Sequence, residues 1–458
     1  MFDVIVVGAG LSGLQAALSA QKAGLSVVII EARDRVGGKV WSVPLASKRG
    51  FADLGAAWIN DNLQKRIRAY VNQFRLQVVE QRLTGNAIMQ THDDRIVYPF
   101  GITPSFAPHE KRNLEMVRDH IQAASLKKEE PRSEDDEQSM DQYICSLGAG
   151  SKTRHMVNLW VRVMHGLEST QESAAWFIDY CRRNKGLLAV RADDPTGGNY
   201  RRITTGAQKI PEMLAGLVGA SNIHLSRPVA SITDHGDHVN VTTTTGQTFV
   251  AKRCIISIPS TMYTDLAISP SLPPPVYEVT SSTQLGHYNK AIVCYDKPWW
   301  RDLGYNGFVL SYQGPVVVAR DTSVDENQMY ALTCFINGEE GEKWSKLHPH
   351  DRRRVVMDQL ATLFDVGLDS ELYRPIEFFE QIWKHEPYSK GALAPVTALG
   401  HYTKFKSVYG KPVGNLHFVG TEYSPEWKGY MEGALCSGEL GAREVVEALK
   451  HAGPASKL

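Results

Sequence analysis

Residues 2–13 read FDVIVVGAGLSG, an apolar run that passes directly into a segment with three glycines. The run 2–7 has the β-branched composition of a buried strand. Apolar residues then recur at helical spacing from Leu14 to Ala23, and Gly24 can end that helix. Residues 27–30, VVII, form a second candidate strand. The stretch therefore predicts a strand–helix–strand unit of an α/β fold.

The glycine spacing of this unit predicts a dinucleotide site. Gly8, Gly10 and Gly13 allow a tight turn, close approach of the backbone to a pyrophosphate, and close packing of helix on strand. The helix begins at Leu11-Ser12, and its free N–H groups would face the phosphates. Glu31 lies 18 residues after the last glycine, where a carboxylate can accept hydrogen bonds from a ribose. An acid there argues against a 2′-phosphate, and NAD and FAD both remain candidates.

Residues 31–42, EARDRVGGKVWS, decide between these two cofactors. The segment 35–39, RVGGK, resembles the RxGGR element of the flavin amine oxidase family, which continues the dinucleotide site along FAD. The resemblance implies FAD contacts for Ala32, Arg33, Gly38, Lys39 and Val40. The paired glycines would let the main chain pass close to the cofactor. The lysine replaces the family's usual arginine, so it keeps the charge and loses the planar fork.

Further motifs resemble the same family, in order and over nearly the whole chain. They are residues 53–59 (DLGAAWI), 205–208 (TGAQ), 418–422 (FVGTE) and 427–434 (WKGYMEGA). By resemblance, a valine main chain holds adenine, a glutamate binds the ribityl chain, and the last helix points its N-terminus at the flavin. The FAD contacts that the resemblance implies in this part of the chain are Gly55, Ala56, Ala57, Trp58, Val229, Pro259, Gly420, Thr421, Glu422, Met431 and Ala434.

The resemblance also implies the architecture, which is an α/β fold of two domains. A Rossmann-type FAD-binding domain would be interleaved with an α+β substrate domain, as in the amine oxidase or p-hydroxybenzoate hydroxylase-like fold. A chain of 458 residues is indeed too long for one compact core. We expect the FAD-binding domain in 1–78, 203–280 and 384–453, the substrate-binding domain in 79–202 and 281–383, and a targeting tail in 454–458.

A few side chains are expected to form the reactive end of the site. Lys290 matches a family lysine that reaches flavin N5 through a water, where its charge would help O2 accept electrons. Trp383 matches a tryptophan packed beside the flavin, and Tyr430 one wall of the aromatic cage around the amine. Leu393 replaces the tyrosine of the other wall, which removes part of the electron-rich lining. Asn199 falls at a polar position near the substrate entrance.

The expected activity is oxidation of an amine to an imine and then an aldehyde or ketone, with O2 reduced to H2O2. The resemblance is strongest to the soluble peroxisomal fungal type of monoamine oxidase. Ala392 replaces the cysteine that binds flavin covalently in the mitochondrial members, which predicts non-covalent FAD. The family likeness also allows a dehydrogenase or desaturase with another acceptor, or a flavoprotein scaffold with a closed site.

An L-amino-acid or polyamine oxidase is a further alternative. L-amino-acid oxidases carry an arginine just after the Gly-Ala of the DLGA-type segment, where this chain has Ala57 and Trp58. We therefore expect an amine without an α-carboxylate. Arg201 and Arg202 keep the amino-acid alternative open.

Composition limits the remaining possibilities. Lys+Arg and Asp+Glu balance at 50 each, which gives no reason to expect nucleic acid as a partner. The six scattered cysteines form no CxxC pair, so no metal site is expected. No apolar stretch reaches the length of a membrane anchor. The ending Ser456-Lys457-Leu458 resembles a peroxisomal address read by the import receptor, which predicts a peroxisomal protein. A homodimer is compatible with the resemblance.

Overall fold

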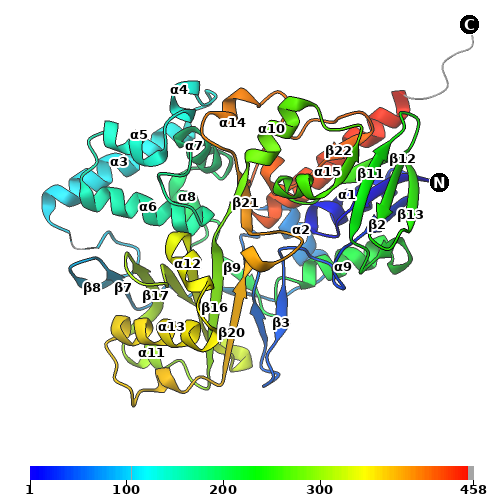
Figure 1. The fold of residues 1–458 in the computed structure, drawn as a ribbon. Helices are drawn as coiled ribbons and strands as arrows, with labels where there is room; N and C mark the ends of the chain where they lie inside the picture. Colours follow the sequence, from blue (N-terminus) through cyan, green and yellow to red (C-terminus); the bar gives the residue numbers. More distant parts are fainter. Residues whose placement is uncertain (105, 452–458) are drawn as a thin grey trace, which may run out of the picture.

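The structure, a computed structural model, describes residues 1–104 and 106–451 and has a mixed α/β architecture (Figure 1). Two large sheets, one of eight and one of seven strands, dominate this part of the chain. The predicted fold class is confirmed, because a parallel Rossmann-type arrangement lies beside a largely antiparallel sheet with flanking helices.

The first sheet contains the strand–helix–strand unit predicted from the opening residues. In spatial order its strands are β10 (Ile223–His224), β2 (Val27–Ile30), β1 (Phe2–Val7), β13 (Thr248–Ile256), β12 (Val239–Thr243), β11 (Val229–Asp234) and β14 (Ala267–Ser269), with β22 (Leu416–Phe418) beside β13. β1 is parallel to both of its neighbours, β2 and β13. Its residues 4–7 are buried, because helices and strands cover both faces of a parallel sheet.

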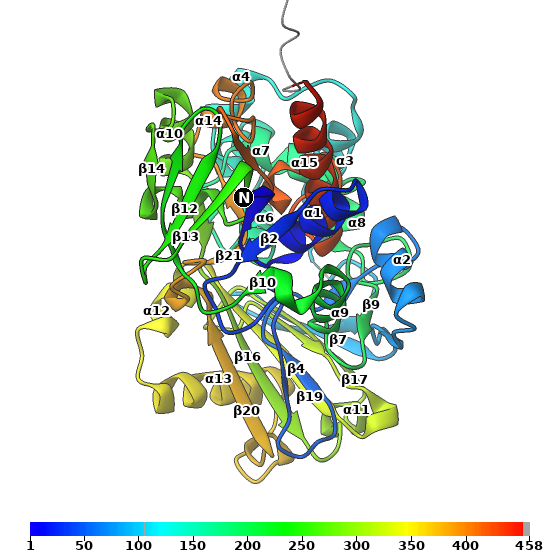
Figure 2. The ribbon, with the colours of Figure 1, turned by 90° about the vertical axis from the view of Figure 1, so that its right-hand side faces the viewer.

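The helices α1 (Leu11–Lys22), α9 (Lys209–Val218) and α15 (Met431–His451) share a core with one face of this sheet. α1 and α15 lie side by side, although they come from opposite ends of the sequence (Figures 1 and 2). A Cβ atom on Gly438 would lie 2.4 Å from the carbonyl oxygen of Ser12, so the close contact requires glycine there. Gly24 follows α1 with a φ of +86°, in agreement with the predicted end of the helix.

The second sheet is antiparallel except where β17 pairs with β7. Its order is β20 (Glu377–Ile382), β16 (Tyr288–Tyr295), β19 (Tyr330–Asn337), β18 (Val318–Asp321), β17 (Tyr305–Ser311), β7 (Asn86–Gln90) and β8 (Arg95–Pro99). Side chains of α11 (Trp299–Asp302) and α13 (Pro349–Phe364) share a core with one face of it. Every residue of β16 is buried, which places its lysine inside the molecule.

A block of helices shares a second core with this sheet (Figure 1). It comprises α3 (Pro108–Leu126), α4 (Ser133–Asp136), α5 (Met140–Ser146), α6 (Ser151–His165), α7 (Ala174–Arg183) and α8 (Leu187–Arg191). Large aromatic side chains such as Trp160 and Trp176 fill this core. The polar stretch 126–138 contains the end of α3 and the short α4 and is mostly exposed.

Shorter elements connect these parts. They are β3 (Ser42–Pro44) with β4 (Phe51–Asp53), β5 (Trp58–Ile59) with β9 (Arg201–Ile203) and β6 (Val78–Glu80), β15 (Gln284–Gly286) with β21 (Ala392–Val396), and the helices α2 (Lys65–Gln73), α10 (Pro274–Ser282), α12 (Gly338–Ser345) and α14 (His401–Lys404). The exact domain boundaries stay predictions. Residues 452–458, which include the predicted targeting tail, lie outside the described residues.

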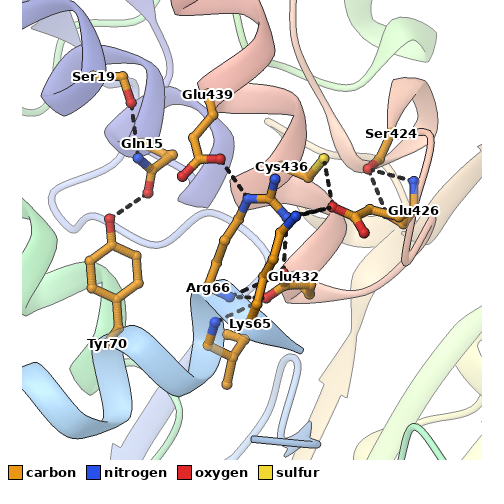
Figure 3. A network of polar contacts seen from close by, with 11 residues as sticks. Gln15, Ser19, Lys65, Arg66, Tyr70, Ser424, Glu426, Glu432, Cys436 and Glu439 are labelled. Atoms are coloured by element: carbon orange, nitrogen blue, oxygen red, sulfur yellow. Dashed lines mark hydrogen bonds and ion pairs between the residues drawn. The ribbon is translucent and has the colours of Figure 1, made fainter. Parts of the chain in front are cut away.

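A polar network ties α2 to α15 (Figure 3). The Arg66 guanidinium contacts the carboxylates of Glu426, Glu432 and Glu439 at 2.7–3.0 Å. The Glu432 carboxylate also accepts hydrogen bonds from the backbone N–H groups of Arg66 and Ile67, in the first turn of α2. The glutamate of the GYMEG segment therefore has a structural role, because it holds α2 against α15.

Candidate active site

A cavity of about 620 Å³ lies where the first sheet, the second sheet and the helical block meet. At one end it reaches the carboxyl ends of β1 and β2, which is where open α/β sheets bind ligands. At the other end it is lined by apolar and aromatic side chains from α6, α7, β17 and β19. A long ligand could therefore touch both ends.

The dinucleotide end is built from backbone. Gly8 has a φ of +101°, which suits the tight turn after β1. Gly10 precedes α1, whose first turn has no side-chain cap, so its N–H groups remain available to a ligand. A Cβ atom on Gly10 would meet nothing within 4 Å, whereas one on Gly13 would lie 2.1 Å from the carbonyl oxygen of Gly8. Gly10 thus leaves room for phosphates, and Gly13 lets α1 pack closely on the strand.

Glu31 lines the cavity at the end of β2 and is 4% exposed. Its carboxylate accepts hydrogen bonds from the backbone N–H groups of Ala9, at 2.6 Å, and Arg33, at 2.9 Å. These bonds hold the glycine turn and the following loop in place. Carboxylate oxygens have further lone pairs, so the group can still accept a ribose hydroxyl.

The loop carrying RVGGK is fixed by the TGAQ turn. Gln208 accepts a hydrogen bond from the N–H of Ser42 and donates one to the carbonyl of Val36. Gly37 donates its N–H to the carbonyl of Ala9, and a Cβ atom on Gly38 would approach Gly10 Cα at 3.4 Å. The two glycine-rich turns therefore lie against each other, as a site that continues along one cofactor requires.

Charged side chains from this loop already have partners in the protein. Arg33 forms an ion pair with Glu386 at 3.1 Å. Lys39 donates to the carbonyl oxygen of Leu393 at 2.5 Å, and burial lowers its pKa while Glu422 opposes the shift. Burial raises the pKa of Glu422, whose carboxylate also accepts the N–H of Ser260. Lys39 thus links the predicted cofactor loop to the wall of the amine site.

These residues fit FAD. An uncapped helix N-terminus, an open space at Gly10 and a buried acid after β2 suit the adenosine diphosphate part. Lys39, Glu422 and Trp383 line the same cavity, so its lining extends beyond the adenosine diphosphate part to a place for the flavin. Trp383 is 2% exposed, and its indole N–H donates to the carbonyl of Leu54 at 3.0 Å.

Tyr430 and Leu393 both line the opposite end of the cavity. The Tyr430 ring lies so close to Gly198 that a Cβ atom there would meet ring atoms at 2.7 Å. The side chains of Tyr430 and Tyr180 lie close to each other, and burial raises the pKa of both phenols, so they are neutral at ordinary pH. The predicted Tyr–Leu cage is therefore extended by a second tyrosine that the sequence motifs did not indicate.

Lys290 reaches the cavity wall from β16. Its ammonium group donates to the carbonyl oxygens of Asp53, at 2.9 Å, and Gly55. It also lies 5.5 Å from the ring centroid of Trp58 and 5.3 Å from that of Phe335. Burial lowers the pKa of Lys290 to about 8, against the opposing effect of Asp53. The group is thus a buried cation whose charge is balanced mainly by backbone carbonyls.

The expected entrance residue Asn199 also lies in the cavity wall. Its side-chain amide donates to the carbonyl of Val190 at 3.4 Å and lies near Asp193. Asp193 is buried and forms an ion pair with Arg320, which lies between the rings of Trp58 and Phe308. The polar position therefore belongs to a buried carboxylate–arginine group.

The structure brings the predicted site residues together. All of them line the cavity except Gly13, which packs beneath it against Gly8. Other lining residues come from segments without a recognisable motif: Leu159, Trp160, Val163, Met164, Tyr180, Arg191, Tyr288, Phe308, Leu310, Arg320 and Phe335. Their sequence context is that of ordinary core helices and strands. In the described ranges no cluster of His, Cys, Asp or Glu could hold a metal ion, and no helix is long and apolar enough to cross a membrane.

Comparison with known proteins identifies relatives of the same kind. A probable flavin-containing monoamine oxidase A of Dictyostelium discoideum is 30% identical over 98% of both chains. A flavin-containing amine oxidase of Danio rerio is 31% identical over 98% of this chain and 86% of its own length. The two relatives are thus similar to this chain from end to end.

Solved structures agree in fold. Wild-type putrescine oxidase bound to putrescine superposes with a TM-score of 0.90 at 23% identity, covering 97% of this chain and 99% of that one. Cyclohexylamine oxidase from Brevibacterium oxydans IH-35A gives 0.89 at 22% identity, over 98% and 99%. Residues 11–446 match the family described as flavin containing amine oxidoreductase. The chain therefore belongs to this family and is an FAD-dependent enzyme that oxidises amines.

Proposed function

We propose that the enzyme deaminates an amine without an α-carboxylate and uses O2 as its electron acceptor. In the overall reaction one amine, one O2 and one water give one aldehyde or ketone, one ammonia or smaller amine, and one H2O2. FAD, which the enzyme binds non-covalently, supplies the two-electron acceptor for the amine. The observation that carries the proposal is the buried cation Lys290 in the wall of a cavity that also holds Tyr430 and Leu393.

The side chains at the amine end favour a neutral amine. Tyr430, Leu393 and Tyr180 form an apolar wall, and the two phenols stay un-ionised. An ammonium ion would lose its hydration there without gaining an ion pair with Asp193, because that carboxylate is already paired with Arg320. The walls therefore bind the deprotonated amine, orient it and exclude bulk water.

Lys290 supports O2 as the acceptor. A positive charge in a low-dielectric wall stabilises negative charge that develops on oxygen as it accepts electrons. The backbone carbonyls of Asp53 and Gly55 hold the ammonium group without neutralising its full charge. The same segment, 53–58, provides other cavity-lining residues, so the charge lies beside the site.

The two arginines that kept the L-amino-acid alternative open in the sequence lie outside the large cavity. Arg201 pairs with Asp61 and Glu80. Arg202 donates to the carbonyl oxygens of Thr322 and Ser323 at 2.8 Å. Neither lines the large cavity. This arrangement supports an amine without an α-carboxylate over an L-amino acid.

The test is H2O2 release by the purified enzyme with a panel of primary, secondary and aromatic amines and L-amino acids. We expect H2O2 in step with amine consumed, for at least one amine, and none with L-amino acids. In a dehydrogenase or desaturase the flavin would lose its colour when amine is added, but H2O2 would not be released quickly, and turnover would need an artificial acceptor. A closed flavoprotein scaffold would show neither signal.

We also propose that the enzyme acts in peroxisomes, where H2O2 is handled. The support is Ser456-Lys457-Leu458, which lies outside the described residues. A fluorescent fusion ending in these residues should be imported, and removal of the tripeptide should leave it in the cytosol. A homodimer is proposed from the family resemblance, and light scattering of the full chain measures it.

A further inference from the structure

One cation that lines the cavity has no ion-pair or hydrogen-bond partner among the described residues. Five cationic side chains line it: Arg33, Lys39, Arg191, Lys290 and Arg320. Four of them have partners, which are Glu386, the Leu393 carbonyl, the Asp53 and Gly55 carbonyls, and Asp193. Among the described residues, no carboxylate lies within ion-pair distance of the Arg191 guanidinium, and no protein atom accepts a hydrogen bond from it.

Arg191 is held in place by its surroundings. It is the last residue of α8, and its guanidinium carbon lies 4.3 Å from the ring centroid of Trp160, another cavity-lining residue. Stacking on an indole fixes the plane of the group while its five N–H donors stay free. Such a donor set matches a carboxylate or a related anion.

The exposure of Arg191 is directed to the cavity. Its surface is accessible to solvent, yet burial lowers its pKa to about 10, and the nearby Arg118 lowers it further. The solvent accessibility and the lowered pKa of Arg191 are compatible if its accessible surface faces the cavity, which is surrounded by protein. The other charged or ionisable groups near it are Tyr98, Asp193 and Cys181, of which only Asp193 is a carboxylate, and that one is paired with Arg320.

A short path of contacts joins Arg191 to the amine end. The Tyr430 ring lies against Gly198, and the neighbouring Asn199 donates to the carbonyl of Val190, the residue before Arg191. One substrate molecule in the cavity could therefore place its amine at Tyr430 and its opposite end at the arginine.

We propose that Arg191 is a specificity-determining residue that binds an anionic group at the far end of the amine substrate. The substrate class is then an ω-amino acid or an ω-amino sulfonate, in which the chain between the two groups is apolar. A second ammonium group at that end would be repelled by Arg191, so diamines are disfavoured. The inference rests on the proposed function, because it assigns the substrate of the same site.

The experiment compares three series of equal chain length, which are n-alkylamines, α,ω-diamines and ω-amino acids, with one ω-amino sulfonate. Anaerobic bleaching of the flavin in the holoenzyme is measured by stopped flow. The wild type should prefer one ω-amino acid or the sulfonate over the matching diamine by at least about tenfold in the limiting bleaching rate divided by the apparent Kd, the scale of one charge-assisted hydrogen bond. Bleaching by the sulfonate as well would identify the anion rather than the carboxylate as the recognised feature.

The variants are R191Q, R191K and R191E, with R112Q as the matched control from an exposed arginine of α3. R191Q should lower the anion-to-alkylamine ratio about tenfold, chiefly through the apparent Kd, and R191K should restore part of it. R191E should invert the preference toward diamines, and R112Q should keep the wild-type ratio. A preference for diamines in the wild type, or a ratio unchanged in R191Q, overturns the inference, while H2O2 release with an alkylamine still upholds the proposed function. If no amine bleaches the flavin, the proposed function fails and the inference with it.

Discussion

The dinucleotide end and the amine end of the cavity are built from different kinds of atoms. At the first, backbone N–H groups and glycines from residues 8–13 and 37–38 form the wall, and one acid, Glu31, closes it. At the second, side chains of at least four helices and strands form the wall. A wall made of backbone atoms keeps its shape when side chains are substituted, so it continues to bind the same ligand. A wall of side chains can be rebuilt by substitution without any change of fold, which is how relatives of one family come to act on different amines.

The largest effect is expected from Lys290, which serves the reaction at the amine end. In K290M the reoxidation of the enzyme by O2 should slow by about 100-fold or more, because a preorganised charge is lost from a desolvated site. Anaerobic bleaching by the amine should change much less. K297M is a suitable control, since Lys297 is exposed and only pairs with Glu371 at 3.3 Å. Equal slowing of both half-reactions would remove the assigned role of Lys290.

Two glycine substitutions separate packing from binding at the dinucleotide end. G13A places a Cβ atom 2.1 Å from the Gly8 carbonyl, and overpacking of this kind costs about 1–3 kcal/mol. Its melting temperature should fall with or without FAD. G10A meets no protein atom within 4 Å, so the apoprotein should keep its stability while FAD binding weakens. Calorimetry and FAD titration of both variants measure this, and unaltered FAD affinity in G10A would contradict the proposed phosphate site.

The pKa of Lys290 predicts a pH dependence. Burial lowers it from the ordinary value of 10.5 to about 8, so the ammonium form is present below pH 8 and is lost above it. Reoxidation by O2 should therefore fall about tenfold between pH 7 and pH 9, as the charged fraction falls by that factor. The dependence should vanish in K290M. A reoxidation rate that rises through this range would show that the neutral amine is the active form.

The smallest effect is expected from rebuilding the cage. L393Y restores the electron-rich wall that the family usually has, which is worth about 0.5–1 kcal/mol for a nearby amine. Small amines should gain about two- to fivefold in kcat/KM, and bulky amines should lose activity because the cage narrows. L393M, of similar volume and without the ring, is the control. An identical substrate profile in L393Y and L393M would show that this wall does not set the preference.

The same contrast explains what could be predicted from the sequence. The strand, helix and glycine turn at residues 2–30 follow from local periodicity and from backbone conformations that glycine favours. The TGAQ and GYMEGA segments matched the family, yet their contacts with Ser42 and Arg66 became visible only in the structure. Tyr180, Arg191 and Arg320 lie on elements whose sequence pattern is that of an ordinary core. Their presence in the cavity depends on long-range packing, which no local pattern encodes.

The most direct test of the central claim is an anaerobic titration of the purified holoenzyme with amines, followed by absorbance. The protein should be yellow, should lose its colour when an amine is added, and should release all of its FAD on denaturation, since Ala392 offers no atom for a covalent bond. A colourless protein that binds NAD, or a yellow protein that no amine bleaches, would contradict the account.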